Sequence, residues 1–176
     1  MTFAETELEG VWLVTPEPQG DHRGFFARTW CEREFAAHGL TDHYVQCSVS
    51  FNTRRGTLRG LHYQRAPHEE AKIVRCTMGA IYDVVLDLRR GSPTFKKHVA
   101  VELTASNHRM LYIPKGCAHG FQTLVDDTEV FYQISAFYAG DHAAGVRWND
   151  PAFGVWWPCE DPILSDRDRS YPDFEG

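Results

Sequence analysis

The residues best suited to acid–base chemistry lie in and just after the stretch Gly56-Thr57-Leu58-Arg59-Gly60-Leu61-His62-Tyr63-Gln64. An imidazole takes up and releases a proton near neutral pH, so His62 is a candidate base. Lys72 follows on the next predicted strand, and its ammonium can stabilise a negative charge that develops on an oxygen atom. Each also has an ordinary interpretation: His62 as a hydrogen-bonded core histidine, and Lys72 as a solvated lysine beside the acidic pair Glu69-Glu70.

A second histidine, His119, ends the segment Pro114-Lys115-Gly116-Cys117-Ala118-His119. Asp83, on an alternating face of the predicted strand 80–88, is a candidate partner for it. Two histidines that follow glycine turns in a β-strand pattern resemble the signature of the cupins. Metal-binding cupins have a second histidine two residues after the first, and Gln64 stands there in this chain. They also use a later glutamate, for which this chain offers only the pair Glu69-Glu70 on a predicted polar turn. Because a transition-metal site normally needs three protein ligands, a metal-dependent dioxygenase or isomerase is the alternative and not the first interpretation.

Alternation predicts which side chains share a face of the strand that carries His62. With a period of two residues, His62 shares its face with Leu58 and Gly60, whereas Arg59 points to the other face unless a bulge redirects it. A glycine inside a strand marks a place where another backbone or a ligand comes close. We therefore expect a close approach at Gly60.

Short strands separated by turn signals account for most of the chain. The predicted strands cover residues 11–14, 25–30, 44–51, 58–64, 72–77, 80–88, 96–103, 110–113, 120–124 and 128–137. The helical candidate is 31–38, which Gly39 ends, and the chain after residue 148 is expected to form an irregular tail. Many short strands without a strand–helix–strand rhythm predict an all-β protein: an antiparallel jelly-roll barrel with few short helices, in one domain over residues 1–176.

Composition excludes several classes of protein. The hydrophobic fraction of 43% is typical of a globular chain, and a net charge of -6 without a dense basic block argues against nucleic acid as a partner. The five cysteines are widely spaced and form no CxxC pair, so neither a disulfide framework nor a zinc ribbon is predicted. No apolar run has the length of a membrane span and the acidic N-terminus lacks a signal-peptide core, so we expect a cytoplasmic protein with no membrane partner.

Six motifs, in this order and spacing, resemble one known family. They are Gly20-Asp21-His22-Arg23-Gly24-Phe25-Phe26, Leu58-Arg59-Gly60-Leu61-His62-Tyr63-Gln64, Lys72-Ile73-Val74-Arg75, Ile113-Pro114-Lys115-Gly116-Cys117-Ala118-His119-Gly120-Phe121, Trp148-Asn149-Asp150-Pro151 and Leu164-Ser165-Asp166-Arg167-Asp168. Together they are similar to the dTDP-4-dehydrorhamnose 3,5-epimerases, metal-free and cofactor-free cupins of deoxysugar biosynthesis. The resemblance runs from about Gly10 to Pro172, which is nearly the whole chain.

The resemblance implies inversion at C3 and C5 of a nucleotide-linked 4-keto-6-deoxyhexose through an enolate. Such chemistry needs a base on one face of the sugar, an acid on the other, and a cation or donor at O4. His62 matches the family's base, Asp168 the carboxylate that orients it, Tyr132 the acid, and Lys72 the residue that stabilises the enolate oxygen. Without the resemblance, Asp168 would be an ordinary surface carboxylate and Tyr132 a packed strand aromatic.

The resemblance also implies a set of substrate-binding residues. Arg23 and Arg59 match the diphosphate contacts, Phe26 an aromatic near the nucleotide base, and Gln46 an amide that binds sugar or phosphate. His119 matches a second donor near the ketone, Tyr138 a residue that assists the acid or binds the pyrophosphate, and Arg167 a further contact in the last motif. A guanidinium suits the diphosphate role because its fork matches phosphate oxygens.

Two positions on the nucleotide side depart from the family. Arg28 stands where the rhamnose-pathway enzymes carry a glutamate that contacts thymine, and Gln46-Cys47-Ser48 replaces the family's Gln-x-Asn. An arginine does not offer the acceptors of a carboxylate, so GDP- or CDP-linked sugars stay open beside dTDP. Epimerisation at C3 alone or C5 alone stays open as well, as does a sugar-binding cupin without enzymatic activity.

The family resemblance further implies a homodimer in which N-terminal strands join the neighbouring sheet. Residues 3–14 supply apolar material for such an edge, and pairing with a second copy would cover an edge strand.

Overall fold

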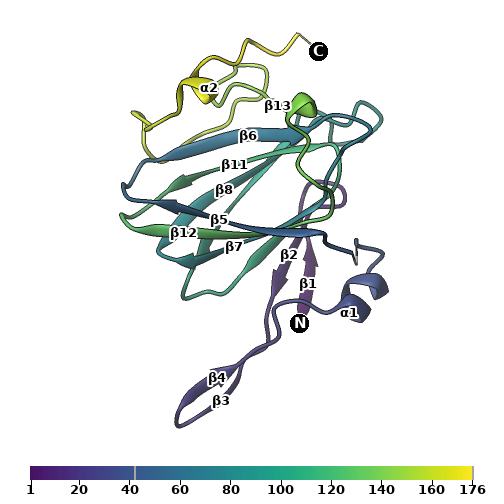
Figure 1. Cartoon of the computed structure of the whole chain (residues 1–176), viewed down its shortest axis with the longest axis vertical. Coiled ribbons are helices and arrows are strands. Elements are labelled where there is room, and N and C mark those ends of the chain that lie inside the picture. Colours follow the sequence, from purple (N-terminus) through teal and green to yellow (C-terminus); the bar gives the residue numbers. More distant parts are fainter. Residues whose placement is uncertain (42, 176) are drawn as a thin grey trace.

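Two antiparallel β-sheets face each other in the computed structural model, which describes residues 1–41 and 43–175 (Figure 1). The larger sheet has six strands in the order β1 (Thr2–Glu5), β2 (Trp12–Thr15), β10 (Met110–Ile113), β7 (Lys72–Met78), β12 (Thr128–Ile134) and β5 (Gln46–Asn52). The smaller sheet has five, in the order β13 (Ala143–Gly145), β6 (Leu58–Gln64), β11 (Cys117–Thr123), β8 (Ala80–Asp87) and β9 (His98–Thr104). From β5 onward, consecutive strands mostly alternate between the sheets. This is the jelly roll that the strand pattern predicts.

A hairpin of β3 (Gln19–Asp21) and β4 (Gly24–Phe26) projects from the body of the molecule (Figure 1). The prediction of a strand over 25–30 is wrong beyond Phe26. Among the described residues, β4 pairs with β3 alone, and Phe26 lies opposite Gln19, the first residue of β3. Residues after Phe26 therefore have no strand to pair with.

The helices are short, as the sequence predicts: α1 (Glu32–Ala37), the 3-10 helix η1 (Gly140–His142) and α2 (Asp166–Arg169). Helix α1 is terminated by Gly39, two residues after its last residue. Gly39 adopts a φ of 68°, and the amides of Gly39 and Leu40 donate to the carbonyls of Ala36 and Phe35. This is a glycine C-terminal cap, because a residue with a Cβ is strained at such a φ. None of the helices in residues 1–41 and 43–175 is long and apolar enough to cross a membrane.

Three apolar clusters hold the sheets in place. The first fills the space between the sheets and includes Val74, Ile81, Val85, Leu111, Phe121 and Val130. The second packs the smaller sheet against the C-terminal tail and includes Leu58, Leu61, Val84, Leu86, Phe153 and Trp157. The third packs α1 against the larger sheet and includes Val14, Phe35, Ile73, Met110 and Tyr112. Each fully buried side chain of this size contributes roughly 1.5–3 kcal/mol, so the clusters make a rigid support.

Strand β6 contains a bulge at Gly60 that reverses its alternation. His62 pairs with His119 and Arg59 with Phe121, so β6 has one residue more than β11 between the two pairs. Arg59 and His62 therefore face the same side. Simple alternation predicts opposite faces unless a bulge redirects one of them, and the structure shows that exception. The expected close approach is confirmed: Gly60 has a φ of 131°, and a Cβ there would lie 2.5 Å from the Cα of Gly120.

The C-terminal tail crosses the outer side of the smaller sheet (Figure 1), and Trp157 of the tail packs against that sheet. Gln122 of β11 clasps the tail, because its amide donates to the carbonyl of Cys159 and accepts from the amide of the same residue. The tail then pairs with the barrel at Thr57 and Ile163 and continues into α2. In this way the tail returns to β6.

Candidate active site

A cavity of about 410 Å³ opens between the two sheets. All of the predicted catalytic and substrate-binding residues line it, except Arg23 and Phe26. The smaller sheet contributes Arg59, His62 and His119; the larger sheet contributes Gln46, Lys72 and Tyr132; the loop after β12 and the tail contribute Tyr138, Arg167 and Asp168. Side chains that are far apart in the sequence thus meet in one place.

His62 and Asp168 form a pair in which the carboxylate orients the ring. His62 Nε2 lies 2.5 Å from Asp168 Oδ1, and the Gly60 amide donates to Asp168 Oδ2 over 3.4 Å. Burial alone would raise the pKa of Asp168, but the hydrogen bond and charge of His62 outweigh it, and the pKa lies below its usual value. With Nε2–H donated to a carboxylate, Nδ1 carries the lone pair and is the basic nitrogen.

The last tail helix places Asp168 beside the strand that carries His62. Ser165 caps α2 by accepting a hydrogen bond from the Asp168 amide over 3.1 Å. Asp168 is buried although its neighbours in α2 are exposed. The interpretation of Asp168 as an ordinary surface carboxylate is therefore wrong.

His119 and Asp83 form a second pair deeper in the same sheet. His119 Nε2 lies 2.7 Å from Asp83 Oδ1, and the two side chains are 5% and 0% exposed. The predicted partnership between these residues is confirmed. His119 is also the register partner of His62, so the two rings come from adjacent strands into one cavity.

Tyr132 reaches the cavity from the opposite sheet. Burial raises the pKa of its phenol, the nearby Asp83 raises it further, and Arg59 acts in the other direction. The hydroxyl therefore stays protonated at neutral pH, which is the form an acid needs. Its ring centroid lies 6.1 Å from that of His119.

Lys72 is an ion-paired lysine at the start of β7. Its Nζ lies 2.7 Å from Glu70 Oε1, and the side chains are 11% and 10% exposed. The interpretation of Lys72 as a solvated lysine is therefore wrong. Glu70, which the sequence places on a polar turn beside Glu69 and not among the substrate-binding residues, lines the cavity. Its proximity to Lys72 in the sequence was the available signal.

Two guanidinium groups stand at the cavity and are held by neighbours. Arg59 Nε donates to Asn52 Oδ1 over 2.7 Å, and Arg167 Nε donates to the Tyr171 hydroxyl over 2.9 Å. The pKa of Arg167 is raised, first by Tyr171 and further by Tyr138. Each guanidinium keeps N–H groups that can meet phosphate oxygens. Asn52 was not predicted from the sequence, because its role depends on the fold of β5 against β6.

The residues that would complete a cupin metal site are otherwise engaged. Gln64 bonds the protein backbone, and Glu70 is paired with Lys72. Over residues 1–41 and 43–175, no three His, Cys, Asp or Glu side chains are grouped so that they could hold a metal ion.

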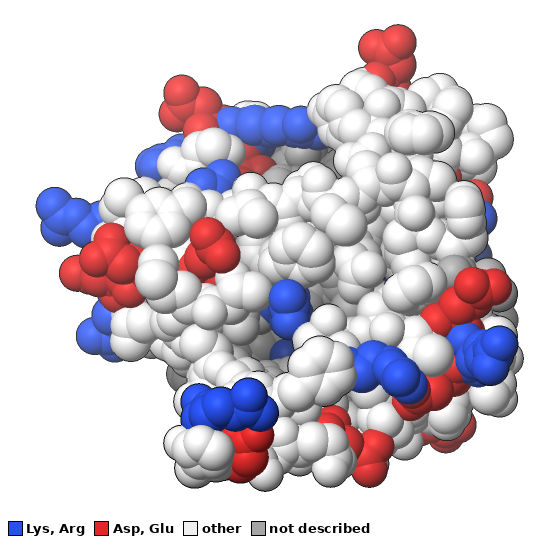
Figure 2. Space-filling model, turned by 60° about the horizontal axis from the view of Figure 1, so that its bottom comes forward, with Lys and Arg blue, Asp and Glu red and all other residues white. Residues whose placement is uncertain are grey.

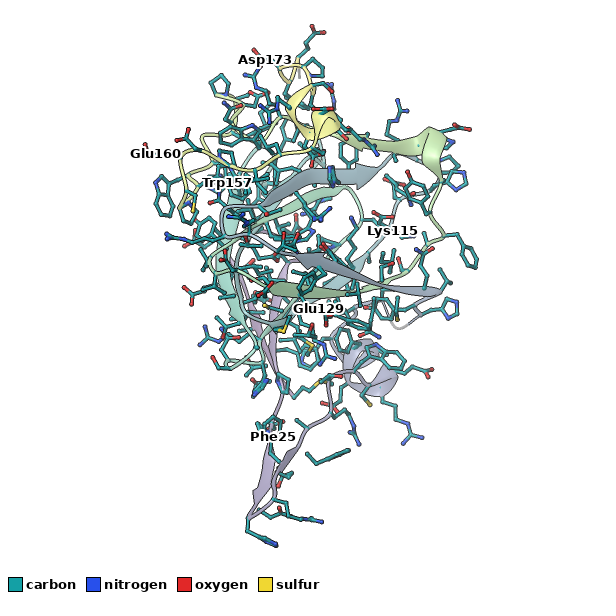
Figure 3. All side chains as sticks on the ribbon, turned by 60° about the vertical axis from the view of Figure 1, so that its left-hand side comes forward. Phe25, Lys115, Glu129, Trp157, Glu160 and Asp173 are labelled. Atoms are coloured by element: carbon teal, nitrogen blue, oxygen red, sulfur yellow. The ribbon has the colours of Figure 1, made fainter. Side chains whose placement is uncertain are left out.

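The hairpin keeps Arg23 and Phe26 away from the cavity of their own chain. Figure 3 shows Phe25 on the projecting hairpin, far below Trp157. Arg23 pairs with Asp21 over 2.5 Å, and Phe26 is 78% exposed. Arg28, just after the hairpin, pairs with Glu34 over 2.9 Å.

The cavity thus combines a carboxylate-oriented imidazole on one wall, a protonated phenol on the opposite wall, and an ammonium and a second imidazole beside them. Proton removal from one face of a small molecule and proton return to the other need this arrangement. A jelly roll with such a site belongs to the acid–base isomerases.

Comparison with known proteins agrees with this class. The family model of dTDP-4-dehydrorhamnose 3,5-epimerase matches residues 5–176. An enzyme of that name from Pseudomonas aeruginosa is 44% identical over 171 residues, covering 96% of this chain and 93% of the relative. The chain belongs to the dTDP-4-dehydrorhamnose 3,5-epimerase family.

Solved structures extend the match to three dimensions. The Bacillus anthracis dTDP-4-dehydrorhamnose 3,5-epimerase with TDP and PPi bound has a TM-score of 0.95 and 44% identity, covering 98% of this chain and 99% of that one. A 3'-monoepimerase from Streptomyces bikiniensis in complex with dTDP-quinovose has a TM-score of 0.88 and 36% identity, covering 96% and 85%. The chain is therefore an isomerase with the jelly roll of these enzymes.

Proposed function

We propose that this isomerase inverts C3 and C5 of a dTDP-linked 4-keto-6-deoxyhexose through an enolate, in deoxysugar and surface-polysaccharide biosynthesis. The observation that carries the proposal is the opposition of two groups across the cavity: the His62–Asp168 pair on the smaller sheet and Tyr132 on the larger one. Family membership supports the substrate class.

The first step takes a proton from a carbon next to the ketone. Nδ1 of His62 accepts the proton, and the electron pair of the C–H bond moves onto O4 to form an enolate. The imidazolium that results is stabilised by Asp168, which lies 2.5 Å away and stays ionised because its pKa is low. The enolate oxygen is stabilised by the Lys72 ammonium. His119 adds a second donor in the form with both ring nitrogens protonated, because its Nε2 already faces Asp83 and only Nδ1–H can then point to the substrate.

The second step returns a proton to the other face. Tyr132 donates its phenolic proton to the carbon, the electron pair of the enolate reforms the ketone, and the centre is inverted. Burial disfavours the tyrosinate, but a carbanionic carbon is a far stronger base than a phenolate, so the transfer is downhill. Tyr132 is then reprotonated, and His62, whose side chain is 38% exposed, passes its proton to solvent.

The nucleotide part is assigned to the basic groups at the cavity. Arg59 and Arg167 suit the two phosphates, and Gln46 suits a sugar or phosphate oxygen. The bound TDP of the Bacillus anthracis structure supports dTDP over GDP and CDP. We also propose that residues 1–176 act as one catalytic domain in the cytoplasm.

Proton NMR in heavy water tests the reaction directly. We expect deuterium at C3 and C5 of dTDP-linked 4-keto-6-deoxyglucose, and slower exchange with the GDP- and CDP-linked sugars. His62→Ala should lower the exchange rate by about 10³-fold at both centres, whereas His98→Ala on β9 should not change it. No exchange with any of the three substrates from folded protein would contradict the proposal.

Epimerisation at C3 alone is the second candidate. The likeness to the 3'-monoepimerase favours it. The same NMR experiment separates the two, because a C3 enzyme places deuterium at C3 and leaves the C5 proton in place.

A homodimer would explain the hairpin. Arg23 and Phe26 match substrate-binding residues, but they stand off the body of their own chain. The side of the molecule turned forward in Figure 2 has a broad uncharged area with charges mostly around its margins. On the larger sheet, Val49 and Phe51 of β5 and Met78 of β7 are exposed. We propose that a second copy covers apolar surface of this kind and that its hairpin completes the cavity.

Mixing two defective variants tests this arrangement. His62→Ala lacks the base, and the double variant Arg23→Ala, Phe26→Ala lacks the hairpin contacts. After unfolding and refolding together, we expect about a quarter of the wild-type rate, because half of the dimers are mixed and each has one intact site. Sedimentation showing a monomer at micromolar concentration, or no recovery on mixing, would contradict it.

A further inference from the structure

Residues 137–139, called the crossing segment here, lie just before η1 in the connection from β12, beside the cavity. Phe137 is 71% exposed and Tyr138 is 66% exposed, so apolar burial does little to hold this segment. Tyr138 nevertheless lines the cavity. Something other than packing of these two aromatic rings must set its position.

Two glutamine side chains hold the backbone of the crossing segment. Gln64 Oε1 accepts from the Ala139 amide over 2.6 Å, and Gln64 Nε2 donates to the Phe137 carbonyl over 3.3 Å. Gln46 Oε1 accepts from the Tyr138 amide over 3.0 Å. Three consecutive residues are thus tied to strands of both sheets through side-chain amides.

Gln64 is the more rigid of the two ties. It is 3% exposed, and its Nε2 also donates to the His68 carbonyl over 2.8 Å. A side chain that both donates to two carbonyls and accepts from an amide must be a carboxamide, since a carboxylate donates nothing at neutral pH. This explains in physical terms what the residue at the cupin ligand position does in this chain.

The far end of the loop is held differently. The backbone of β13 pairs with β6 from Ala143 opposite Gln64 to Gly145 opposite His62, and the Arg65 amide donates to the His142 carbonyl over 2.9 Å. Loss of the Gln64 amide should therefore loosen residues 137–139 and leave β13 in place.

We propose that Gln64 is a positioning residue that fixes the crossing segment and thereby sets Tyr138 at the cavity for binding of the nucleotide diphosphate. Tyr138 lies beside Arg167, one of the two guanidinium groups assigned to the phosphates. This inference rests on the proposed function for its effect on catalysis. The tie itself is independent of the substrate.

Amide hydrogen exchange tests the tie without any substrate. In Gln64→Leu, a substitution of similar size, we expect exchange at residues 137–139 to rise by about tenfold or more, since the Ala139 amide loses its acceptor. Gln122→Leu is the matched control. Gln122 is also fully buried and also clasps backbone through both amide atoms, but at Cys159 in the tail. It should speed exchange near Cys159 and leave residues 137–139 unchanged.

Gln64→Glu gives a second variant that retains the acceptor for Ala139 and loses both donated hydrogen bonds. We expect it to speed exchange at residues 137–139 less than Gln64→Leu. Wild-type exchange at these residues in both variants would overturn the proposal, whatever the enzyme does with substrate.

Kinetics test the role in binding. Gln64→Leu should raise KM about tenfold and change kcat by less than about threefold, because Tyr138 is misplaced while the base and acid are untouched. If Gln64 acts through Tyr138, then Gln64→Leu should add little to KM in a Tyr138→Ala background. If KM in the double variant instead rises by the product of the two single-variant increases, the proposal is overturned. If the wild-type enzyme shows no turnover, but amide hydrogen exchange at residues 137–139 is faster in Gln64→Leu, the proposed reaction is refuted and the hydrogen bonds from Gln64 to the crossing segment remain established.

Discussion

The two histidine–aspartate pairs of the cavity contain the same chemical groups but are supported differently. His119 and Asp83 lie on adjacent strands of one sheet, and their side chains are almost fully buried. His62 lies on the next strand, but its partner Asp168 comes from a short helix in the tail, and the His62 side chain is 38% exposed. Only one of the two imidazoles therefore has easy access to solvent.

This difference indicates how the two pairs divide the work. A base that must release its proton in every cycle needs contact with water or substrate, which suits His62. A donor that must hold one position at the ketone is better placed in a dry, rigid sheet, which suits His119. Within the described residues, Asp83 Oδ2 has no hydrogen-bond partner. Burying the Asp83 carboxylate with one oxygen unpaired costs stability. A role for the pair next to the negative charge that develops at the ketone would explain why this arrangement is kept.

The largest effect on rate is expected at the exposed pair. Asp168→Asn removes the charge that stabilises the imidazolium and should lower kcat about 100-fold while the protein stays folded. Steady-state kinetics check this, with Asp166→Asn in the same helix as the control, since Asp166 is exposed. Equal rates in the two variants would remove Asp168 from the base unit.

A smaller effect on rate is expected at the buried pair. Asp83→Asn keeps the shape but weakens the hold on His119, so kcat should fall about tenfold and the free energy of unfolding by about 1–3 kcal/mol. Urea unfolding and kinetics on the same sample measure both. If the rate instead falls as far as in Asp168→Asn, the two pairs are equivalent and the division of work is wrong.

No effect on rate per folded molecule is expected at a third buried aspartate, Asp87. Burial would raise its pKa, but hydrogen bonds from Arg89, Ser92 and Thr94 bring it down to about 2. A carboxyl whose folded pKa lies below the usual value of 3.8 stabilises the fold above that value, and this stability is lost as pH falls from about 4 towards 2.

Asp87→Asn should therefore lower the free energy of unfolding at pH 7 by about 2 kcal/mol. The variant should also lose less further stability than the wild type between pH 4 and pH 2. Unfolding curves at several pH values check this. If the free energy of unfolding of Asp87→Asn falls between pH 4 and pH 2 as steeply as that of the wild type, the acid sensitivity is assigned to Asp168, whose pKa is also lowered.

Local sequence patterns were sufficient to predict most strands of the two large sheets, the cap at Gly39 and the partnership of His119 with Asp83, but not β1, β3 or β13. They failed where the structure depends on contacts between distant segments. Gly60 signalled the close approach of another backbone, which is that of Gly120, but a period of two does not show that β6 carries a bulge there. Only the family resemblance pointed to Asp168, since a charged tail carries no local sign that it folds back on β6.

The ion pair of Lys72 with Glu70 shows a further limit of prediction from sequence patterns. A charged pair in adjacent positions of a sequence usually lies in solvent, and only the enclosure between two sheets turns it into part of a cavity. The hairpin residues Arg23 and Phe26 show another, because their place relative to a substrate depends on what lies beyond their own chain.

The docking of the tail on the barrel has a consequence for thermal inactivation. The bond from Asp168 to His62 exists only while the irregular tail stays on the smaller sheet, whereas the sheets are held by their own buried clusters. Irregular segments open at lower free energies than packed sheets. On heating, we therefore expect the enzyme to lose its catalytic activity several degrees below the temperature at which its barrel unfolds, and to regain that activity immediately on cooling.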